Sequence, residues 1–307
     1  MVGGIRILSS YNNGVIKNIN VTNVKQLAIY VGDENTYSDI RNFYNTASDR
    51  PSDPNDINFY KTRFYNYWRY DDKAKAVSSS QAAWYKATRT QSLLVDQCLF
   101  QNNNIPYPSY SGPVALSSVL KDLNQSQYKV TNPLGRFYNS LELNLSNSKF
   151  LLQSRSIASV TSASETKTRN FYHNVPCLYI GYSADAFIRG CSFTNGHYGI
   201  HLDKACRYFR LIGNTYERIP TAAQATAQIS ASTNQAQITQ GCYLVKVSGE
   251  SGRPAIRGII MEVPYAEINS SIRLENAQKI QVIGGITELS QGTNTSNNTL
   301  NSWLTAW

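Results

Sequence analysis

Charged side chains are scarce in this chain, and so are methionine and histidine. Asp, Glu, Lys and Arg make up 16% of the 307 residues, and only two Met and three His are present. Asn, Ser, Thr, Gln and 21 Tyr take their place. Helical proteins rely on Ala, Leu, Glu and Lys, whereas β-branched and aromatic residues suit strands. The composition therefore predicts an all-β chain.

Signals of several other protein classes are missing. No run of eighteen apolar residues is present, so we expect no membrane insertion. The first residues lack the basic stretch and long apolar core that a secretory signal requires. The five cysteines are odd in number and show no CxxC or CxxH spacing, so we expect buried, reduced thiols and neither disulfides nor a zinc site. We expect no metal and no other cofactor.

The chain is basic, with a formal charge of +9 from 29 Lys and Arg against 20 Asp and Glu. Such a surface favours anionic partners, among them nucleic acid, acidic lipid and acidic polysaccharide. The charges are scattered singly, however, and no helix-turn-helix, zinc-finger or RNA-binding signature accompanies them. We therefore expect no nucleic-acid partner. An acidic polysaccharide and an ordinary solvated surface both remain open.

An eight-residue pattern recurs along the chain, and Ile188–Asn195 is its reference copy. The order is apolar, polar, Gly or amide, small or apolar, variable, large apolar, polar, and often Asn. Further copies start at Ile16, Val95, Leu211 and Ile256, with looser ones at Ile40, Leu145 and Val282. The pattern describes a short strand with one buried face, a corner where Gly or Asn adopts a left-handed conformation, and a second strand. It predicts one inward column of Ile16, Ile40, Val95, Leu145, Ile188, Leu211 and Ile256.

The spacing of the copies indicates a solenoid. It is 24 residues from Ile16 to Ile40, 23 from Ile188 to Leu211 and 26 from Ile256 to Val282. Units of this length suit one turn of a β-solenoid, and the leucine-rich-repeat signature is missing. We predict a right-handed parallel β-helix of roughly a dozen coils over residues 1–290. Loops are expected near 43–85, 102–116 and 221–240, and a polar C-terminal tail over 291–307.

The repeat, its Asn and Gly corners and the segment Gly199–Asp203 resemble the right-handed β-helices of the pectate-lyase-like group, and within it bacteriophage tailspikes and tail fibres. This resemblance covers nearly the whole chain at the level of the fold. It implies an extracellular homotrimer on the virion tail that recognises the host by binding a bacterial surface polysaccharide. Many members of the group also act as a depolymerase on that polysaccharide, and others only bind it.

Departures from that group keep other functions open. The calcium-binding aspartate cluster and the R-x-P-x-x-R-like segment of pectate lyases are missing, so calcium-assisted elimination is not expected. One alternative is a non-catalytic adhesin or structural fibre component. Another is a free bacterial polysaccharide lyase or hydrolase.

Two glutamates share an outward position in the repeat. Glu217 and Glu262 both follow the large apolar residue of their copies. Glycoside hydrolases place two carboxylates on either side of the bond that they cleave. Glu217 and Glu262 are therefore our candidate acid and base, with Asp203 in reserve. The alternative is that both are ordinary solvated carboxylates.

A second candidate site lies in the segment 195–204. His201 and Asp203 alternate with Ile200 and Leu202, which predicts that both point outward on one face. A histidine beside a carboxylate can act as a general base, and Tyr198 could donate a proton, as a lyase requires. The alternative is a polar corner between strands.

Other residues are candidates for sugar binding. Arg189, Arg207 and Arg218 could hold an acidic sugar, because a guanidinium pairs with a carboxylate through two hydrogen bonds. Tyr67 and Trp68 lie in an aromatic-rich stretch and offer flat faces to sugar rings. The alternative for these two rings is packing of an inserted loop or a contact between subunits.

Overall fold

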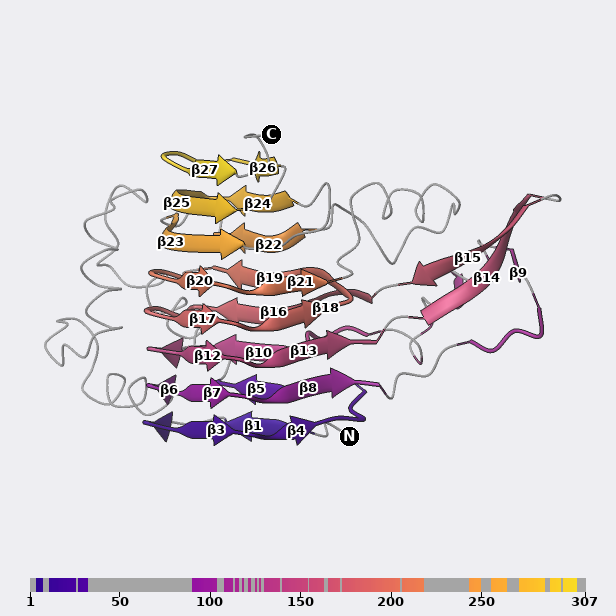
Figure 1. Ribbon diagram of the computed structural model, residues 1–307, viewed down its shortest axis with the longest axis horizontal. Helices are drawn as coiled ribbons and strands as arrows, with labels where there is room; N and C mark the ends of the chain where they lie inside the picture. The colour runs from indigo at the N-terminus through magenta and orange to yellow at the C-terminus, as the bar shows by residue number, and fades with distance from the viewer. Residues whose placement is uncertain are drawn as a thin grey trace, which may run out of the picture.

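β-strands stacked in layers make up the body of the molecule (Figure 1). The computed structural model describes residues 4–7, 11–25, 27–32, 90–103, 108–112, 114–115, 118, 121–122, 125, 127, 130–138, 140–153, 155–162, 165–171, 173–204, 206–217, 243–249, 255–263, 271–284, 288–293 and 295–302. The predicted loops at 43–85 and 221–240 lie outside these residues.

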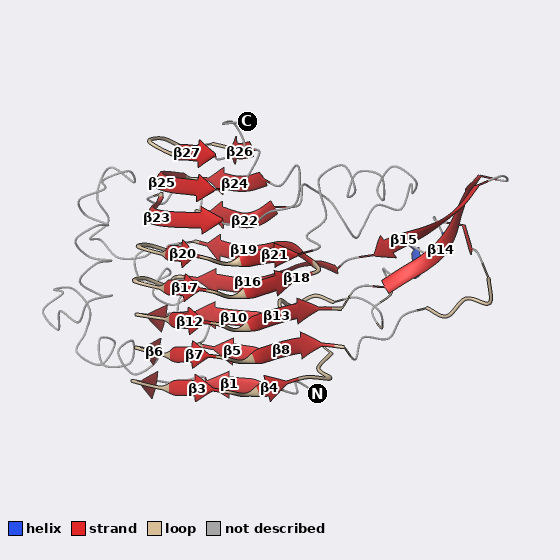
Figure 2. Ribbon diagram, in the orientation of Figure 1, coloured by secondary structure: helices blue, strands red, loops and turns tan. Residues whose placement is uncertain are grey.

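Two eight-stranded sheets, each with only parallel neighbours, form most of this body (Figure 2). Sheet A consists of β1 (Ile5–Ile7), β5 (Ile29–Val31), β10 (Gly135–Tyr138), β16 (His173–Gly181), β19 (Gly196–Asp203), β22 (Tyr243–Ser248), β24 (Ser271–Glu275) and β26 (Glu288–Gln291). Sheet B consists of β3 (Val15–Lys17), β7 (Leu94–Asp96), β12 (Asn144–Ser146), β17 (Phe187–Arg189), β20 (Arg210–Ile212), β23 (Ile256–Val263), β25 (Ala277–Gly284) and β27 (Thr299–Ser302).

Three smaller sheets complete the described strands. Parallel sheet C contains β4 (Asn20–Val21), β8 (Leu99–Asn102), β13 (Lys149–Leu152), β18 (Ser192–Thr194) and β21 (Thr215–Glu217). A short parallel sheet contains β2 (Tyr11–Asn12), β6 (Thr90–Gln91) and β11 (Ser140–Leu141). The third comprises β9 (Val114–Ala115), β14 (Arg155–Ser162) and β15 (Glu165–Phe171), and its antiparallel β14–β15 hairpin projects from the stack (Figure 1).

The chain visits the sheets in a fixed order. Each pass adds one strand to sheet A and then one to sheet B, and the first five passes continue into sheet C. The fold is thus all-β with long parallel sheets, as predicted, and is compatible with a parallel β-helix. The described residues make eight passes, or about 34 Å at the usual strand spacing. Roughly a dozen coils were predicted for residues 1–290, and segments such as the β14–β15 hairpin lengthen the chain between the eight described passes.

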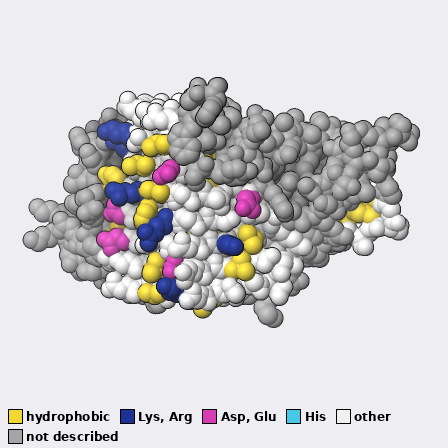
Figure 3. Space-filling model, in the orientation of Figure 1, with side chains coloured by type: hydrophobic (Ala, Val, Ile, Leu, Met, Phe, Trp, Pro, Cys, Tyr) yellow, Lys and Arg dark blue, Asp and Glu magenta, His cyan; other side chains and the backbone are white. Residues whose placement is uncertain are grey.

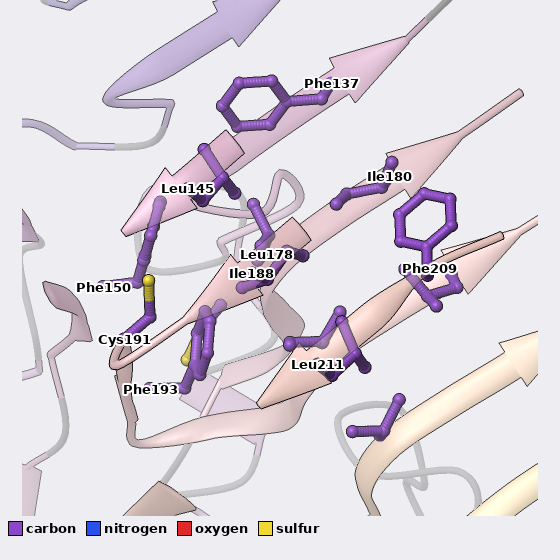
Figure 4. Packing of buried hydrophobic residues seen from close by; sticks show 14 of the residues in the cluster. Phe137, Leu145, Phe150, Leu178, Ile180, Ile188, Cys191, Phe193, Phe209 and Leu211 are labelled. Atoms are coloured by element: carbon purple, nitrogen blue, oxygen red, sulfur yellow. The ribbon is translucent and has the colours of Figure 1, made fainter. Parts of the chain in front are cut away.

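The predicted core column is largely confirmed. Strand pairing aligns Ile16, Val95, Leu145, Ile188 and Leu211 in sheet B. Leu145, Ile188 and Leu211 lie side by side in the interior (Figure 4). The column continues through Met261, Val282 and Leu300. Ile40 lies outside the described residues.

Ile256 does not belong to this column, so that part of the prediction is wrong. Ile256 is buried but pairs with Ala277, and Met261 occupies the position beside Leu211. The backbone of the corners explains the error. Gly258 has a φ of 70°, yet it belongs to the corner that leads into sheet B, whereas Gly190 belongs to the corner that leaves it.

Both corners require the left-handed backbone conformation. The corner that leaves sheet B has φ between 49° and 64° at Asn18, Gln97, Asn147, Gly190 and Gly213. The corner that enters it has positive φ at Asn13, Ser92, Glu142, Asp185, Tyr208, Gly258, Lys279 and Asn297. Asn and Gly tolerate this conformation at least cost, which confirms the corner prediction.

Stacked aromatic rings fill the core beneath sheet C. Ring centroids are 5.0 Å apart from Phe100 to Phe150, 5.4 Å from Phe150 to Phe193 and 5.6 Å from Phe193 to Tyr216. Sheet A makes room for them with glycine. A Cβ on Gly135 would lie 2.8 Å from Cε1 of Phe150, so only glycine fits opposite this ring.

The cysteines behave as predicted where they are described. Cys98, Cys177, Cys191 and Cys206 are buried free thiols. Burial raises the pKa of Cys177, Cys191 and Cys206 to about 12, so these thiols stay protonated. No helix within the described ranges is long and apolar enough to cross a membrane.

The C-terminal boundary differs from the prediction. Residues 291–307 were expected to form a polar tail, but Thr299–Ser302 form β27 and pair with β25. Leu300 packs against the core at the end of the Ile16 column. A single apolar residue among Asn, Ser and Thr was too weak a signal for a strand.

Candidate binding face on sheet A

The outward side of sheet A carries aromatic and cationic side chains on successive strands. Strand pairing aligns one column of Arg6, Tyr30, Arg136, Tyr179, His201, Lys246, Arg273 and Ser290. Their neighbours along each strand, such as Ile180 and Leu202, are buried in the core. This column, together with Tyr138, Tyr198, Asp203, Tyr243, Ser248 and Glu275, is called the sheet A face below.

Cations lie over rings along this face. The guanidinium carbon of Arg6 is 5.6 Å from the ring centroid of Tyr30. Arg136 lies 5.7 Å from the ring of Tyr138. Such contacts contribute about 0.5–2 kcal/mol each, depending on solvent exposure.

The same alternation continues on the following strands. His201 meets the Tyr179 ring edge-on at 5.3 Å and the Tyr198 ring at 5.6 Å. Tyr198 stacks on Tyr243 at 6.1 Å, and the Lys246 ammonium lies 5.5 Å from the Tyr198 ring. The sheet A face is therefore a continuous surface of rings and positive charges.

Asp203 is the central acceptor of a hydrogen-bond network at the middle of the face. Its carboxylate accepts a 2.6 Å bond from the Tyr179 hydroxyl and a 3.0 Å bond from Ser248 Oγ. The backbone N–H of Lys204 donates a third bond of 2.8 Å. Because these donors come from the two strands that flank β19 and from the corner after it, the network also fixes the register of the passes.

His201 also belongs to this network, but the direction of its hydrogen bond differs from that of a histidine that acts as a general base. Its Nε2 lies 2.6 Å from Ser248 Oγ, whose own proton is directed to Asp203, so Nε2–H donates to the serine. A serine nucleophile would need the reverse, with the imidazole accepting the serine proton. Burial, followed by the nearby Lys246 charge, lowers the pKa of His201 from 6.5 to about 4, although Asp203 opposes this shift. His201 is therefore neutral near pH 7.

This shift predicts a pH-dependent stability. The unfolded chain protonates His201 near pH 6.5, whereas the folded chain does so only near pH 4. Stability should therefore fall as the pH drops through this window, by about 3 kcal/mol. The His201→Gln variant keeps a donor for Ser248 and should lose this contribution. Unfolding free energies at pH 7.5 and pH 4 measure it.

The matched control is Lys149→Gln, at an exposed position of β13. It should reproduce the pH dependence of the parent protein, including the part due to carboxylates. If His201→Gln and the parent lose the same stability between pH 7.5 and pH 4, the shifted histidine is refuted.

A charged group follows at the C-terminal end of the face. Arg273 donates to Glu275 at 3.1 Å and to Ser290 at 2.7 Å, and the Lys246 ammonium lies 3.9 Å from Glu275. The side chain of Lys246 is 21% exposed and that of Arg273 is 27% exposed. Glu275 thus neutralises part of the positive charge.

The local sequence pattern predicted the orientation of the β19 side chains correctly. His201 and Asp203 both point outward on β19, as the alternation predicts, and Tyr198 lies beside His201. Tyr179, Ser248, Lys246 and Arg136 were missed. Each comes from another pass, and no short-range signal in the sequence gives the register between passes.

Glu217 and Glu262 are not brought together, and their predicted shared offset is wrong. Glu217 lies in sheet C and pairs with Thr194, whereas Glu262 lies in sheet B and pairs with Ile283. The misaligned Ile256 copy caused this error, because Met261 is the residue that aligns with Leu211. The geometric reason for treating the two glutamates as acid and base is therefore removed.

The predicted arginines are also separated from this face or lie outside the described residues. Arg189 is exposed on sheet B, 5.3 Å from the ring of Phe187. Arg207 forms an isolated bridge with Arg257 at the corner leading into sheet B. Arg218, Tyr67 and Trp68 lie outside the described residues.

Sheet B presents a different surface. Hydrophobic side chains and both kinds of charged side chain gather in a band over its strands (Figure 3). Val15 is 59% exposed and Ile260 38% exposed. At one end of the band Asp96 accepts a bond from Ser146 and pairs with Lys17 at 3.3 Å, and these contacts lower its pKa.

Neither a metal site nor a known relative assigns a role to the sheet A face. Within the described part of the chain, no group of three or more His, Cys, Asp or Glu side chains could hold a metal ion. Comparison with protein-family models, curated proteins and solved structures gives no match for this chain. The functional argument therefore rests on geometry and chemistry.

Proposed function

We propose that this chain is a right-handed parallel β-helix of the bacteriophage tail type, and that its sheet A face binds a bacterial surface polysaccharide. Eight parallel passes with left-handed corners support the solenoid. The unbroken series of rings and cations from Arg6 to Tyr243 carries the binding proposal. Aromatic faces suit the apolar sides of sugar rings, and cations suit their hydroxyl and carboxylate oxygens.

The shape of the face favours a polymer over a small molecule. It extends across all eight strands of sheet A, and its rings recur on neighbouring strands about 4.8 Å apart. A glycan chain lying across the strands would meet one ring or cation after another. Weak contacts of this kind add up over several sugars.

The test compares two tyrosines. Tyr198→Ala removes a ring that contacts His201, Tyr243 and Lys246, so we expect about tenfold weaker polysaccharide binding, equal to about 1.4 kcal/mol. Tyr208→Ala removes a tyrosine that is 42% exposed at the corner into sheet B and should bind normally. Binding is measured by calorimetry on purified capsular and lipopolysaccharides from a strain panel. Equal losses in the two variants would refute the sheet A face as the site.

An extracellular homotrimer on the virion tail is part of the same proposal. The exposed aliphatic side chains of sheet B, Val15 and Ile260 among them, could be covered by neighbouring subunits. Light scattering should then give about three times 34.3 kDa. A monomer at high concentration would contradict the trimer without affecting the binding site.

Depolymerisation is the second candidate function. Asp203 and Glu275 share one outward column with only Ser248 between them, which places their strands about 9.6 Å apart. Inverting glycoside hydrolases separate their carboxylates by roughly 6.5–9.5 Å. This pair replaces Glu217 and Glu262 as the geometrically reasonable choice. New reducing ends in a bound polysaccharide would support hydrolysis, whereas an intact polymer after long incubation would favour binding alone.

A further inference from the structure

Arg136 occupies an unusual position on the sheet A face. It lies on β10, paired with Tyr30 on one side and Tyr179 on the other. Its guanidinium lies 5.4 Å from the Tyr179 ring and 5.7 Å from that of Tyr138. Half-buried, it is held by one ring from its own strand, Tyr138, and one from the next pass, Tyr179.

No acid balances this charge in the described part of the chain. Nε of Arg136 is buried and has no hydrogen-bond partner, and no ion pair is formed with a described residue. Arg273, by contrast, is paired with Glu275, and Lys17 with Asp96. A half-buried, unpaired guanidinium costs free energy, which an incoming anion would recover.

The nearest carboxylate on the face is already engaged. Asp203 accepts the Tyr179 hydroxyl, Ser248 and the Lys204 backbone N–H, so the Tyr179 ring stands between Arg136 and this acid. The tyrosines therefore orient Arg136 without neutralising it. A planar guanidinium stacked on rings still presents its terminal Nη groups to a planar anion, even where Nε is buried.

We propose that Arg136 is the receptor for a carboxylate on the bound glycan, so that the sheet A face selects an acidic sugar. This inference rests on the proposed glycan-binding function and specifies its ligand. The rings of Tyr138 and Tyr179 fix the guanidinium, and the carboxylate of a uronic-acid residue supplies the missing counter-charge. The other cations of the face raise the local concentration of such a polymer.

The experiment follows the Nε–H resonance of Arg136 by NMR, assigned from its loss in Arg136→Gln. The probes are D-glucuronate, D-glucose and inorganic phosphate. We expect a saturable shift with glucuronate, none with glucose and a smaller response to phosphate. A control variant, Arg189→Gln, removes an equal charge from the exposed side of sheet B and should leave the Arg136 response unchanged.

Each other outcome overturns the assignment. No response to glucuronate would show that Arg136 is not a receptor. Equal shifts with glucose would show recognition of the sugar and not of its charge, and a stronger response to phosphate would replace the carboxylate with a phosphate group.

The polysaccharide assay separates this inference from the proposed function. On an acidic polysaccharide, Arg136→Gln should weaken binding at least tenfold, and Arg136→Lys should recover only part because it lacks the planar fork. If the parent binds such a polymer and Arg136→Gln binds it equally well, the receptor is refuted while the binding face stands. If no polysaccharide binds but glucuronate shifts Arg136, the proposed function fails and the anion site remains.

Discussion

Replacing Ile188 with Asp should destabilise the fold by several kcal/mol. Ile188 is fully buried and pairs with Leu145 on one side and Leu211 on the other. A carboxylate at this position has no donor in the apolar column and must either stay charged in the core or be protonated. We expect loss of cooperative unfolding or a large decrease in the urea midpoint, monitored by tryptophan fluorescence and circular dichroism.

The neighbouring residue provides the control. Arg189 is exposed on the same strand, so Arg189→Asp should change stability by about 0.5 kcal/mol or less. The contrast between adjacent positions tests the inward and outward alternation of sheet B. If the two variants unfold alike, Ile188 does not face the core.

Replacing Phe150 with Ala should cost about 3–5 kcal/mol. Phe150 is fully buried and stacks between Phe100 and Phe193, with Gly135 opposite its ring. Its removal leaves a cavity in the aromatic stack that the adjoining strands cannot close without breaking their pairing. Chemical unfolding of the purified variant measures the loss.

Lys149→Ala is the matched control, because Lys149 precedes Phe150 on β13 and is exposed. It should remain close to the parent in stability. A Phe150→Ala protein that unfolds at the same urea concentration as Lys149→Ala would contradict the stacked core beneath sheet C.

Much of the fold could be predicted because each copy of the repeat reflects requirements of residues that are close together in the sequence. At Ile188 and Gly190 an inward apolar side chain is followed by a residue that accepts positive φ, and the same pair recurs at Ile16 and Asn18. The apolar residue and the residue with positive φ lie within three positions of each other, so the pair can be seen directly in the sequence. The copies that share this pair of residues were aligned correctly with one another.

The predicted alignment of Ile256 failed because the two corners on either side of sheet B both require a residue with positive φ. Gly258 resembles Gly190 in sequence and in φ, but it enters sheet B and does not leave it. Only the pairing of Leu211 with Met261 distinguishes the two corners, and this pairing spans 50 residues. The length of chain inserted between passes is not encoded in the repeat, so the predicted shared offset of Glu217 and Glu262 was wrong.

The candidate site was predicted in part for the same reason. His201 and Asp203 share a strand, so their common orientation follows from the two-residue period. Tyr179 and Ser248 reach Asp203 from the strands before and after it. Their contribution, like that of Arg136, depends on the register between distant segments.

Hydroxyl-radical footprinting of the tyrosines tests the central claim, that the sheet A face binds the polysaccharide, most directly. The protein is oxidised with and without a polysaccharide that it binds, and modification is measured at each tyrosine by mass spectrometry. We predict protection of Tyr30, Tyr198 and Tyr243 on the sheet A face, with unchanged modification of Tyr208 at the corner into sheet B. Protection of Tyr208, with Tyr198 and Tyr243 modified as in the free protein, would place the ligand elsewhere and contradict the account.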